Sequence, residues 1–134
     1  MERPRIIIAD DHVQVTVQLR HLLSRHFDVV ATVGNGRDLV GAAMSLKPDI
    51  VVTDISMPDM DGLQAACAIG AALPRTGIVF ITVHDDRALA LKAMNCGQAY
   101  VLKSSAGEDL LDAMTAVLNG ERYVSPMLRG VAAT

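Results

Sequence analysis

The stretch IVVTDISMPDMDG, residues 50–62, carries the main evidence for the architecture. It begins with Ile50–Val52, a run of β-branched apolar residues that is typical of a strand buried on both faces. Such a run usually ends in a turn of Gly, Asn or Ser, but this one ends in Asp54. Two more carboxylates, Asp59 and Asp61, follow in a loop punctuated by Pro and Gly. A carboxylate at the tip of a buried strand therefore needs a chemical explanation.

The composition is that of one globular domain. The chain has 134 residues, of which 51% are hydrophobic and 3% aromatic, so Val, Ile, Leu, Ala and Met must fill the core. The net charge of -3 gives no indication of a nucleic-acid-binding surface. No apolar run approaches the roughly 20 residues of a membrane span, and the N-terminus lacks a signal-peptide pattern. We expect a cytoplasmic protein without a membrane segment.

The two cysteines, Cys67 and Cys96, lie in or directly at the end of stretches that we predict as helix. We interpret both as buried, reduced thiols, which fits a cytosolic protein. The chain has no Cys-x-x-Cys motif and no cluster of His and Cys, so we expect no zinc site.

Short apolar runs alternate with longer amphipathic stretches along the whole chain. The predicted strands are Arg5–Ala9, Phe27–Val33, Ile50–Thr53, Gly77–Ile81 and Tyr100–Leu102. The predicted helices are Val13–Arg25, Arg37–Leu46, Leu63–Ala72, Arg87–Asn95 and Glu108–Asn119. Nearly continuous apolar strands joined by helical crossovers indicate a parallel sheet covered on both faces. This pattern predicts a doubly wound α/β domain with five strands in the flavodoxin-like order 2-1-3-4-5.

One helix prediction conflicts with the local pattern. Residues 13–19, VQVTVQL, alternate apolar and polar with period two, which taken alone favours a strand. However, Val15, Leu19, Leu22 and Leu23 also form a helical stripe, and a right-handed crossover needs a helix here. We predict a helix.

The domain is predicted to end near residue 120. Asn119-Gly120 has the pattern of a helix C-terminus. The Ser125-Pro126 pair and the small residues after it are typical of a linker. We therefore divide the chain into a domain over residues 1–120 and the start of a linker over residues 121–134.

Polar side chains follow four of the predicted strands. Asp10 and Asp11 follow the first strand, Asp54 the third, Thr82 the fourth and Lys103 the fifth. The carboxyl ends of the first and third strands are neighbours where the strand order reverses, which is where open parallel sheets bind ligands. Three close carboxylates need a counter-charge, and hard oxygen ligands favour Mg²⁺. Together with a hydroxyl group and a lysine, they can stabilise a phosphoryl group in transfer.

The same residues carry a family resemblance. The chain resembles the receiver (CheY-like) domain of two-component response regulators in its Asp10-Asp11 pair, in "DISMPDMDG" at residues 54–62, in Thr82 after "IVFI" and in "YVLK" at residues 100–103. The details "DDH", "TVHDD" and "GERYVSP" are most similar to the NarL/FixJ (LuxR-type helix-turn-helix) subfamily. The resemblance implies a phosphorylation-activated domain, not an enzyme in its own right. It also implies transcriptional control through a DNA-binding output domain that this chain lacks.

The resemblance implies a role for each site residue. Asp54 would receive a phosphoryl group from a histidine kinase. Asp11, Asp54 and the backbone carbonyl of Ser56 would ligate Mg²⁺, and Asp10 would act through water.

The other site residues would act on or beyond the phosphoryl group. Lys103 would pair with its oxygens, and Thr82 would bond one of them. Tyr100 would change rotamer as part of the switch. Ser56 and His84 would flank the acyl phosphate and tune its lifetime.

One segment departs from the family pattern. The usual Gly-Ala-x-Gly before the aromatic residue of the fifth strand reads CGQA at residues 96–99, with Cys96 and Ala99 in place of glycines. This departure affects the path from the fourth helix to Tyr100 and leaves the acidic site untouched.

Simpler interpretations stay open for several of these residues. Asp10 and Asp11 are also a plausible helix cap, and Lys103 a solvated lysine. Tyr100 fits plain core packing and His84 an exposed loop. Asp59 and Asp61, which lie outside this site, we interpret mainly as turn formers.

Other functions fit less well. An aspartyl phosphatase needs a second Asp where this chain has Ser56, and Gly34-Asn35-Gly36 is too short for a dinucleotide-binding motif. A stand-alone receiver that acts only through protein–protein contacts remains the alternative.

A surface for homodimerisation is also predicted. The fourth helix is apolar, with Arg87 and Lys92 as its basic residues, and the fifth is expected to expose Glu108, Asp109 and Asp112. Two copies could pair there with opposite charges meeting. A surface made of the first and fifth helices is the alternative.

Overall fold

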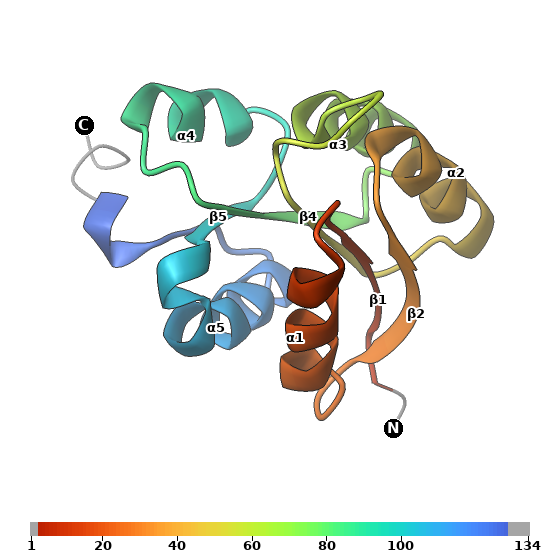
Figure 1. Cartoon of the computed structure of the whole chain (residues 1–134), viewed down its shortest axis with the longest axis horizontal. Coiled ribbons are helices and arrows are strands. Elements are labelled where there is room, and N and C mark those ends of the chain that lie inside the picture. The colour runs from red at the N-terminus through yellow and green to blue at the C-terminus, as the bar shows by residue number, and fades with distance from the viewer. Residues whose placement is uncertain (1–2, 129–134) are drawn as a thin grey trace.

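A six-stranded, fully parallel sheet forms the centre of the protein in a computed structural model that describes residues 3–128 (Figure 1). The strand order is β2-β1-β3-β4-β5-β6. The strands are β1 (Arg5–Ala9), β2 (Asp28–Val33), β3 (Ile50–Thr53), β4 (Gly77–Thr82), β5 (Ala99–Leu102) and β6 (Tyr123–Val124). The helices are α1 (Val13–Leu23), α2 (Gly36–Leu46), α3 (Gly62–Ala72), α4 (Arg87–Ala93) and α5 (Ala106–Leu118), with short 3₁₀ turns at Lys103–Ser105 and Pro126–Leu128.

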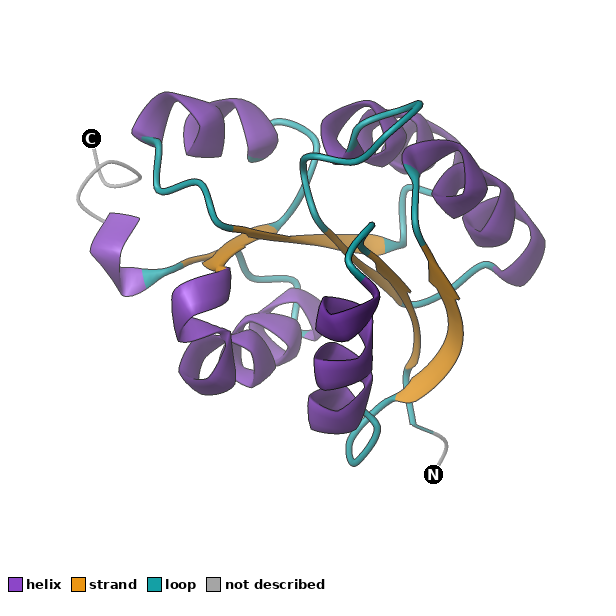
Figure 2. Cartoon of the chain, in the orientation of Figure 1, coloured by secondary structure: helices purple, strands orange, loops and turns teal. Residues whose placement is uncertain are grey.

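The helices cover both faces of the sheet. Helices α1 and α5 lie on one face, and α2, α3 and α4 lie on the other (Figures 1 and 2). Successive residues of β1 point to opposite faces, so that Ile6 and Ile8 belong to the core under α1 and α5, whereas Ile7 and Ala9 belong to the core under α2 to α4. The doubly wound, flavodoxin-like class predicted from the sequence is thereby confirmed.

The number of strands differs from the prediction. Five strands were expected, and the structure adds β6, which pairs in parallel with β5 through Ala99↔Tyr123 and Tyr100↔Val124. A strand of two residues is too short to leave an alternating pattern in the sequence. Part of the segment assigned to a linker thus lies against β5, and residues 129–134 of that segment lie outside the described residues.

The first helix forms as predicted despite its alternating sequence. Leu19 and Leu23 are buried, whereas Val13 and Val17 are 75% and 60% exposed. The helical stripe therefore decides the local structure: Val13 and Val17 of the strand-like pattern face solvent, whereas Val15 packs against the core.

The interpretation of the cysteines as buried thiols is wrong. Cys67 is exposed on α3, Cys96 lies in the turn after α4, and the two form a disulfide with their Cα atoms 5.0 Å apart. The error arose because α3 and this turn are distant in sequence but neighbours in the fold. Within residues 3–128, no helix combines the length and apolar character needed to cross a membrane.

Candidate functional site

The predicted carboxylates meet at the carboxyl edge of the sheet. Strands β1 and β3 pair directly, with Ala9 opposite Thr53, so the residues that follow them lie side by side. The amide of Asp54 donates to the carbonyl of Ala9 at 2.9 Å, and the amide of Asp10 donates to the carbonyl of Val33 at 3.0 Å. These bonds continue the sheet past its strand ends and fix both carboxylates.

Lys103 bridges the two buried carboxylates. Its Nζ atom lies 2.7 Å from Oδ2 of Asp10 and 3.0 Å from Oδ2 of Asp54, and its side chain is 16% exposed. Burial alone would lower the pKa of Lys103, but hydrogen bonds and charge from Asp10 and Asp54 outweigh it and raise that pKa above its ordinary value. The ammonium group is therefore a fixed positive charge at neutral pH.

The acidic group has the composition of a metal site. Asp10, Asp11, His12 and Asp54 each place one ligand atom within 4.8 Å of the others. The buried Oδ2 of Asp10 accepts no regular hydrogen bond and has the ammonium of Lys103 as its partner among the described residues. A buried carboxylate oxygen of this kind is stabilised by a cation, so these residues fit a divalent metal with oxygen ligands.

His12 was not assigned to this group by the sequence analysis. Its Nδ1 atom lies 3.2 Å from carboxylate oxygens of both Asp10 and Asp11, and its amide donates to Oδ1 of Asp10 at 2.8 Å. Its position next to the acidic pair was the available signal. The amide contact turns the chain sharply between β1 and α1.

The loop after Asp54 is shaped by close backbone contacts. The amide of Gly62 donates to the carbonyl of Ile55 at 2.7 Å, and a Cβ atom at Gly62 would overlap the carbonyl of Asp54. Asp61 caps α3 by accepting from the amide of Gln64 at 2.8 Å. Asp59 adopts a left-handed conformation with φ of 67°. The loop carboxylates Asp59 and Asp61 thus occupy turn and cap positions, as the sequence indicated.

A second set of polar contacts connects the site to the loop before α4. Thr82 is buried at the end of β4, and its Oγ1 accepts from the amide of His84 at 3.1 Å. The hydroxyl of Tyr100 donates to the carbonyl of His84 at 2.7 Å, and Nε2 of His84 lies 3.2 Å from Oγ of Ser56. Every residue predicted to act at or beyond the phosphoryl group is therefore joined to this β4–α4 loop or to Asp54.

Tyr100 lies in an environment that disfavours its ionised form. Burial, followed by the negative charges of Asp86, Asp85 and Asp54, raises the pKa of Tyr100 to about 12. The phenol therefore stays a hydrogen-bond donor over the whole physiological range.

One acidic residue of α5 does not face solvent as expected. Asp109 is buried, and its Oδ2 accepts from Oγ of Ser105 at 2.8 Å and from Oγ of Ser125 at 3.2 Å. Ser125 in turn accepts from the amide of Leu102 at 3.0 Å. The expectation failed because Ser125, assigned to the linker, supplies a buried partner. Glu108 and Asp112 are exposed as predicted.

The sequence matches the model of the response regulator receiver domain over residues 6–115. It is 32% identical over 123 residues to the uncharacterized transcriptional regulatory protein YxjL of Bacillus subtilis (strain 168), which covers 90% of this chain and 56% of that protein. It is 35% identical over 128 residues to the oxygen regulatory protein NreC of Staphylococcus haemolyticus (strain JCSC1435), which covers 92% of this chain and 59% of that protein. The chain thus spans less than two thirds of these curated relatives.

Solved structures agree with this assignment. A two-component response regulator of the LuxR family from Aurantimonas sp. SI85-9A1 superposes with a TM-score of 0.92 at 32% identity and covers 98% of this chain and 96% of its own. The isolated receiver domain of RcsB from Salmonella enterica serovar Typhimurium, solved with the phosphomimetic BeF3-, gives a TM-score of 0.88 at 25% identity, covering 97% and 99%. With the aspartates at the carboxyl edge, the bridging lysine and this likeness in sequence and structure, the chain belongs to the response regulator receiver domain family and is of the NarL/LuxR type.

Proposed function

We propose that the chain accepts a phosphoryl group on Asp54. A carboxylate oxygen of Asp54 attacks the phosphorus of a donor, the bond between phosphorus and the donor's leaving group breaks, and an aspartyl phosphate forms. The observation that carries the proposal is Lys103, whose ammonium lies within 3.0 Å of both Asp10 and Asp54. From there it can pair with the incoming phosphoryl oxygens.

Mg²⁺ is the proposed cofactor. Asp11, Asp54 and the backbone carbonyl of Ser56 would hold it, with Asp10 acting through water. When bound, it would offset the negative charge that the phosphoryl group adds to the carboxylates. His12, which contacts Asp10 and Asp11, orients the acidic pair.

The donor and the setting are inferred from the family. We infer a sensor histidine kinase as donor and the cytoplasm as location. The chain is a phospho-acceptor that assists its own phosphorylation and dephosphorylation, not an enzyme that acts on a separate substrate.

The phosphoryl group is proposed to act on a distant surface. Thr82 and Tyr100 both contact His84 at the start of the β4–α4 loop, which supports a path from Asp54 to α4. On α4, Leu91 is 53% exposed and is flanked by exposed Lys92. We infer that phosphorylation shifts an existing equilibrium toward a homodimer that uses this face.

The output is proposed to be transcription. The curated relatives include a transcriptional regulatory protein, and a structure of RcsB, 25% identical to this chain, shows two RcsB dimers bound to two parallel DNAs. A DNA-binding output domain would act in the longer protein. The alternative is a stand-alone receiver that acts through protein contacts alone.

The phosphorylation proposal is tested by intact-mass spectrometry after incubation with acetyl phosphate and Mg²⁺. We expect the mass of one phosphoryl group on the wild type and none on Asp54→Asn. Asp59→Asn is the matched control, because Asp59 is an exposed carboxylate on the same loop. Equal labelling of Asp54→Asn, or an unlabelled wild type, would overturn the proposal.

A further inference from the structure

We propose that Cys67 and Cys96 form a reversible thiol–disulfide pair whose oxidation state controls how strongly α4 responds to phosphorylation of Asp54. The proposal rests on the proposed function and names a second input to the same switch. It also gives a role to the cysteine that departs from the family pattern before β5.

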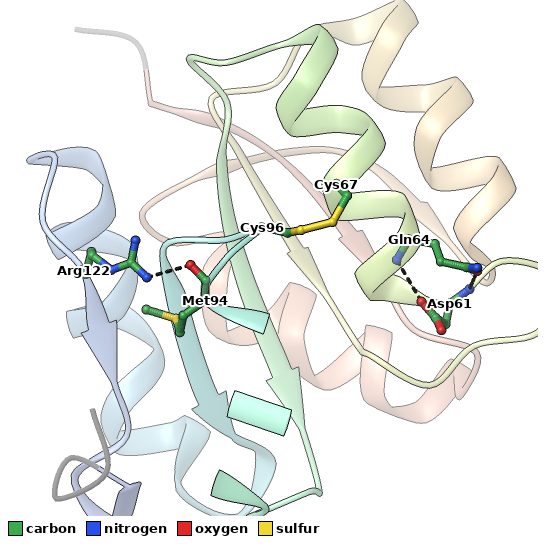
Figure 3. Close-up of a disulfide and its surroundings, with 6 residues drawn as sticks. All are labelled: Asp61, Gln64, Cys67, Met94, Cys96 and Arg122. Atoms are coloured by element: carbon green, nitrogen blue, oxygen red, sulfur yellow. Dashed lines mark hydrogen bonds between the residues drawn. A yellow bond between two sulfur atoms is a disulfide. The ribbon is translucent and has the colours of Figure 1, made fainter. Parts of the chain in front are cut away.

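The disulfide connects helix α3 to the turn between α4 and β5. Cys67 lies in the middle of α3, which begins directly after the loop carrying Asp54 (Figure 3). Cys96 lies in the turn between α4 and β5. The bond closes a sequence separation of 29 residues. In the oxidised form, the C-terminal end of α4 is therefore covalently anchored to α3.

The turn that carries Cys96 is already well ordered on its other sides. The amide of Gln98 donates to the carbonyl of Ile78 at 2.9 Å, and its side-chain oxygen accepts from the amide of Ile78 at 2.6 Å. Arg122 donates to the carbonyl of Met94 at 2.7 Å (Figure 3). These bonds hold the turn to β4 and to the chain before β6, so the disulfide adds a specific restraint toward α3.

Helix α4 is consequently held at both ends. At its start, the hydroxyl of Tyr100 bonds to the carbonyl of His84, and this contact belongs to the proposed switch. At its end, the disulfide holds the turn. The disulfide opposes any movement started at His84 that carries the C-terminal end of α4 away from α3, so oxidation should weaken the coupling and reduction should strengthen it.

The bond is accessible to exchange. Cys67 is exposed and Cys96 is partly buried. A thiolate of a low-molecular-weight thiol attacks Sγ of Cys67, and Cys96 leaves as a thiolate. A second thiol then releases Cys67 from the mixed disulfide, so that two thiols become one small disulfide while the protein gains two thiols. A low-molecular-weight disulfide such as oxidised glutathione reverses the reaction.

The fold does not depend on this bond for its core. Cys67 belongs to neither of the two apolar cores of the described residues, and Cys96 only packs against one of them as a partly buried residue. A disulfide in a reducing compartment is usually transient and regulatory. The location and exposure of this pair fit such a role.

The experiment uses the whole chain in reduced and in oxidised glutathione. Alkylation followed by mass spectrometry counts the free thiols in each form. Acetyl phosphate labelling reports whether Asp54 accepts the phosphoryl group. Hydrogen exchange of the α4 amides, with and without beryllofluoride and Mg²⁺, reports the response of the helix.

We expect both forms to be labelled on Asp54. The change in hydrogen exchange of α4 that beryllofluoride causes should be at least about fivefold larger in the reduced form, which is the low end of typical coupling strengths. The variants Cys67→Ser and Cys96→Ser should behave like the reduced wild type in either buffer. Two free thiols in oxidised glutathione, or equal α4 responses in two labelled forms, would overturn the proposal. If neither form is labelled, the proposed phosphorylation of Asp54 is wrong, and the proposed control by the disulfide, which depends on it, is wrong as well.

Discussion

The hydroxyl group of Tyr100 and the backbone carbonyl of His84 are joined by a hydrogen bond of 2.7 Å. The bond requires a neutral phenol, because a phenolate cannot donate. It ties β5 to the loop that follows Thr82, so its loss should be felt both in stability and in the transfer of the signal.

Alkaline pH should break this contact over a defined range. Because the pKa of Tyr100 rises from 10.0 in the unfolded chain to about 12 in the folded one, its contribution to the free energy of unfolding is full below pH 10 and is lost as the pH rises through 12. The loss is at most about 3 kcal/mol. Urea unfolding at several alkaline pH values measures it.

Tyr100→Phe should flatten this pH dependence, because it removes the phenol whose pKa is raised on folding. The free energy of unfolding of Tyr100→Phe should still fall somewhat as the pH rises. The reason is that the pKa of Lys103 is also raised on folding, so its ion pairs with Asp10 and Asp54 are likewise lost at high pH. An unchanged slope in Tyr100→Phe would show that the phenol is not the titrating group.

Magnesium should stabilise the folded chain through the acidic group. A ligand that binds only the folded state at a hundredfold excess over its Kd adds about 2.7 kcal/mol to the free energy of unfolding. We expect most of this gain to vanish in Asp11→Ala, measured by urea unfolding with and without Mg²⁺. Asp112→Ala removes an exposed carboxylate on α5 and should keep the full gain. An equal gain in Asp11→Ala would place the ion elsewhere.

The contact between Ser56 and His84 should set the lifetime of the aspartyl phosphate. Oγ of Ser56 and Nε2 of His84 are 3.2 Å apart, and Ser56 also donates its amide to Oδ1 of Asp54 at 3.3 Å. We expect the pair to limit the approach of water, so His84→Ala should shorten the half-life severalfold. The decay of the phosphoryl mass over time measures it.

A different role for His84 predicts the opposite change in the half-life of the aspartyl phosphate. If His84 instead activated water as a general base, His84→Ala would lengthen the half-life. His26→Ala changes an exposed histidine outside this group and serves as the control.

Mutations on two exposed surfaces should identify the dimer interface. Leu91 on α4 is 53% exposed, and Val17 on α1 is 60% exposed. If α4 forms the interface, Leu91→Glu should abolish the dimerisation induced by beryllofluoride, and Val17→Glu should not. Sedimentation velocity separates the two cases, and the reverse result would assign the interface to α1 and α5.

The parts of the fold that were predicted well are those decided by local burial. Strands β1 and β3 match the predicted bounds Arg5–Ala9 and Ile50–Thr53, because short runs rich in β-branched residues favour a strand over a buried helix. The carboxyl edge of a parallel sheet is also fixed by topology, so the meeting of Asp10, Asp54 and Lys103 followed from their places after the strands.

The features that were missed depend on contacts between distant segments. The pairing of Cys67 with Cys96 requires that α3 lie beside the turn before β5, which no local pattern encodes. Likewise, Asp109 is buried because Ser125 returns to it from beyond α5. A charged residue in the first turn of a helix is normally exposed, and Asp109 is buried only because a residue from a distant segment hydrogen-bonds to it.

The short strand β6 has a consequence for how two molecules can meet. An unpaired strand at the border of a sheet can accept a strand from another chain, but the border of β5 is occupied by Tyr123 and Val124. The sheet therefore cannot extend directly from β5 into a second copy. An assembly on the face of α4 would instead meet through side chains that the helix exposes, such as Leu91, so small movements of the helix can adjust its strength.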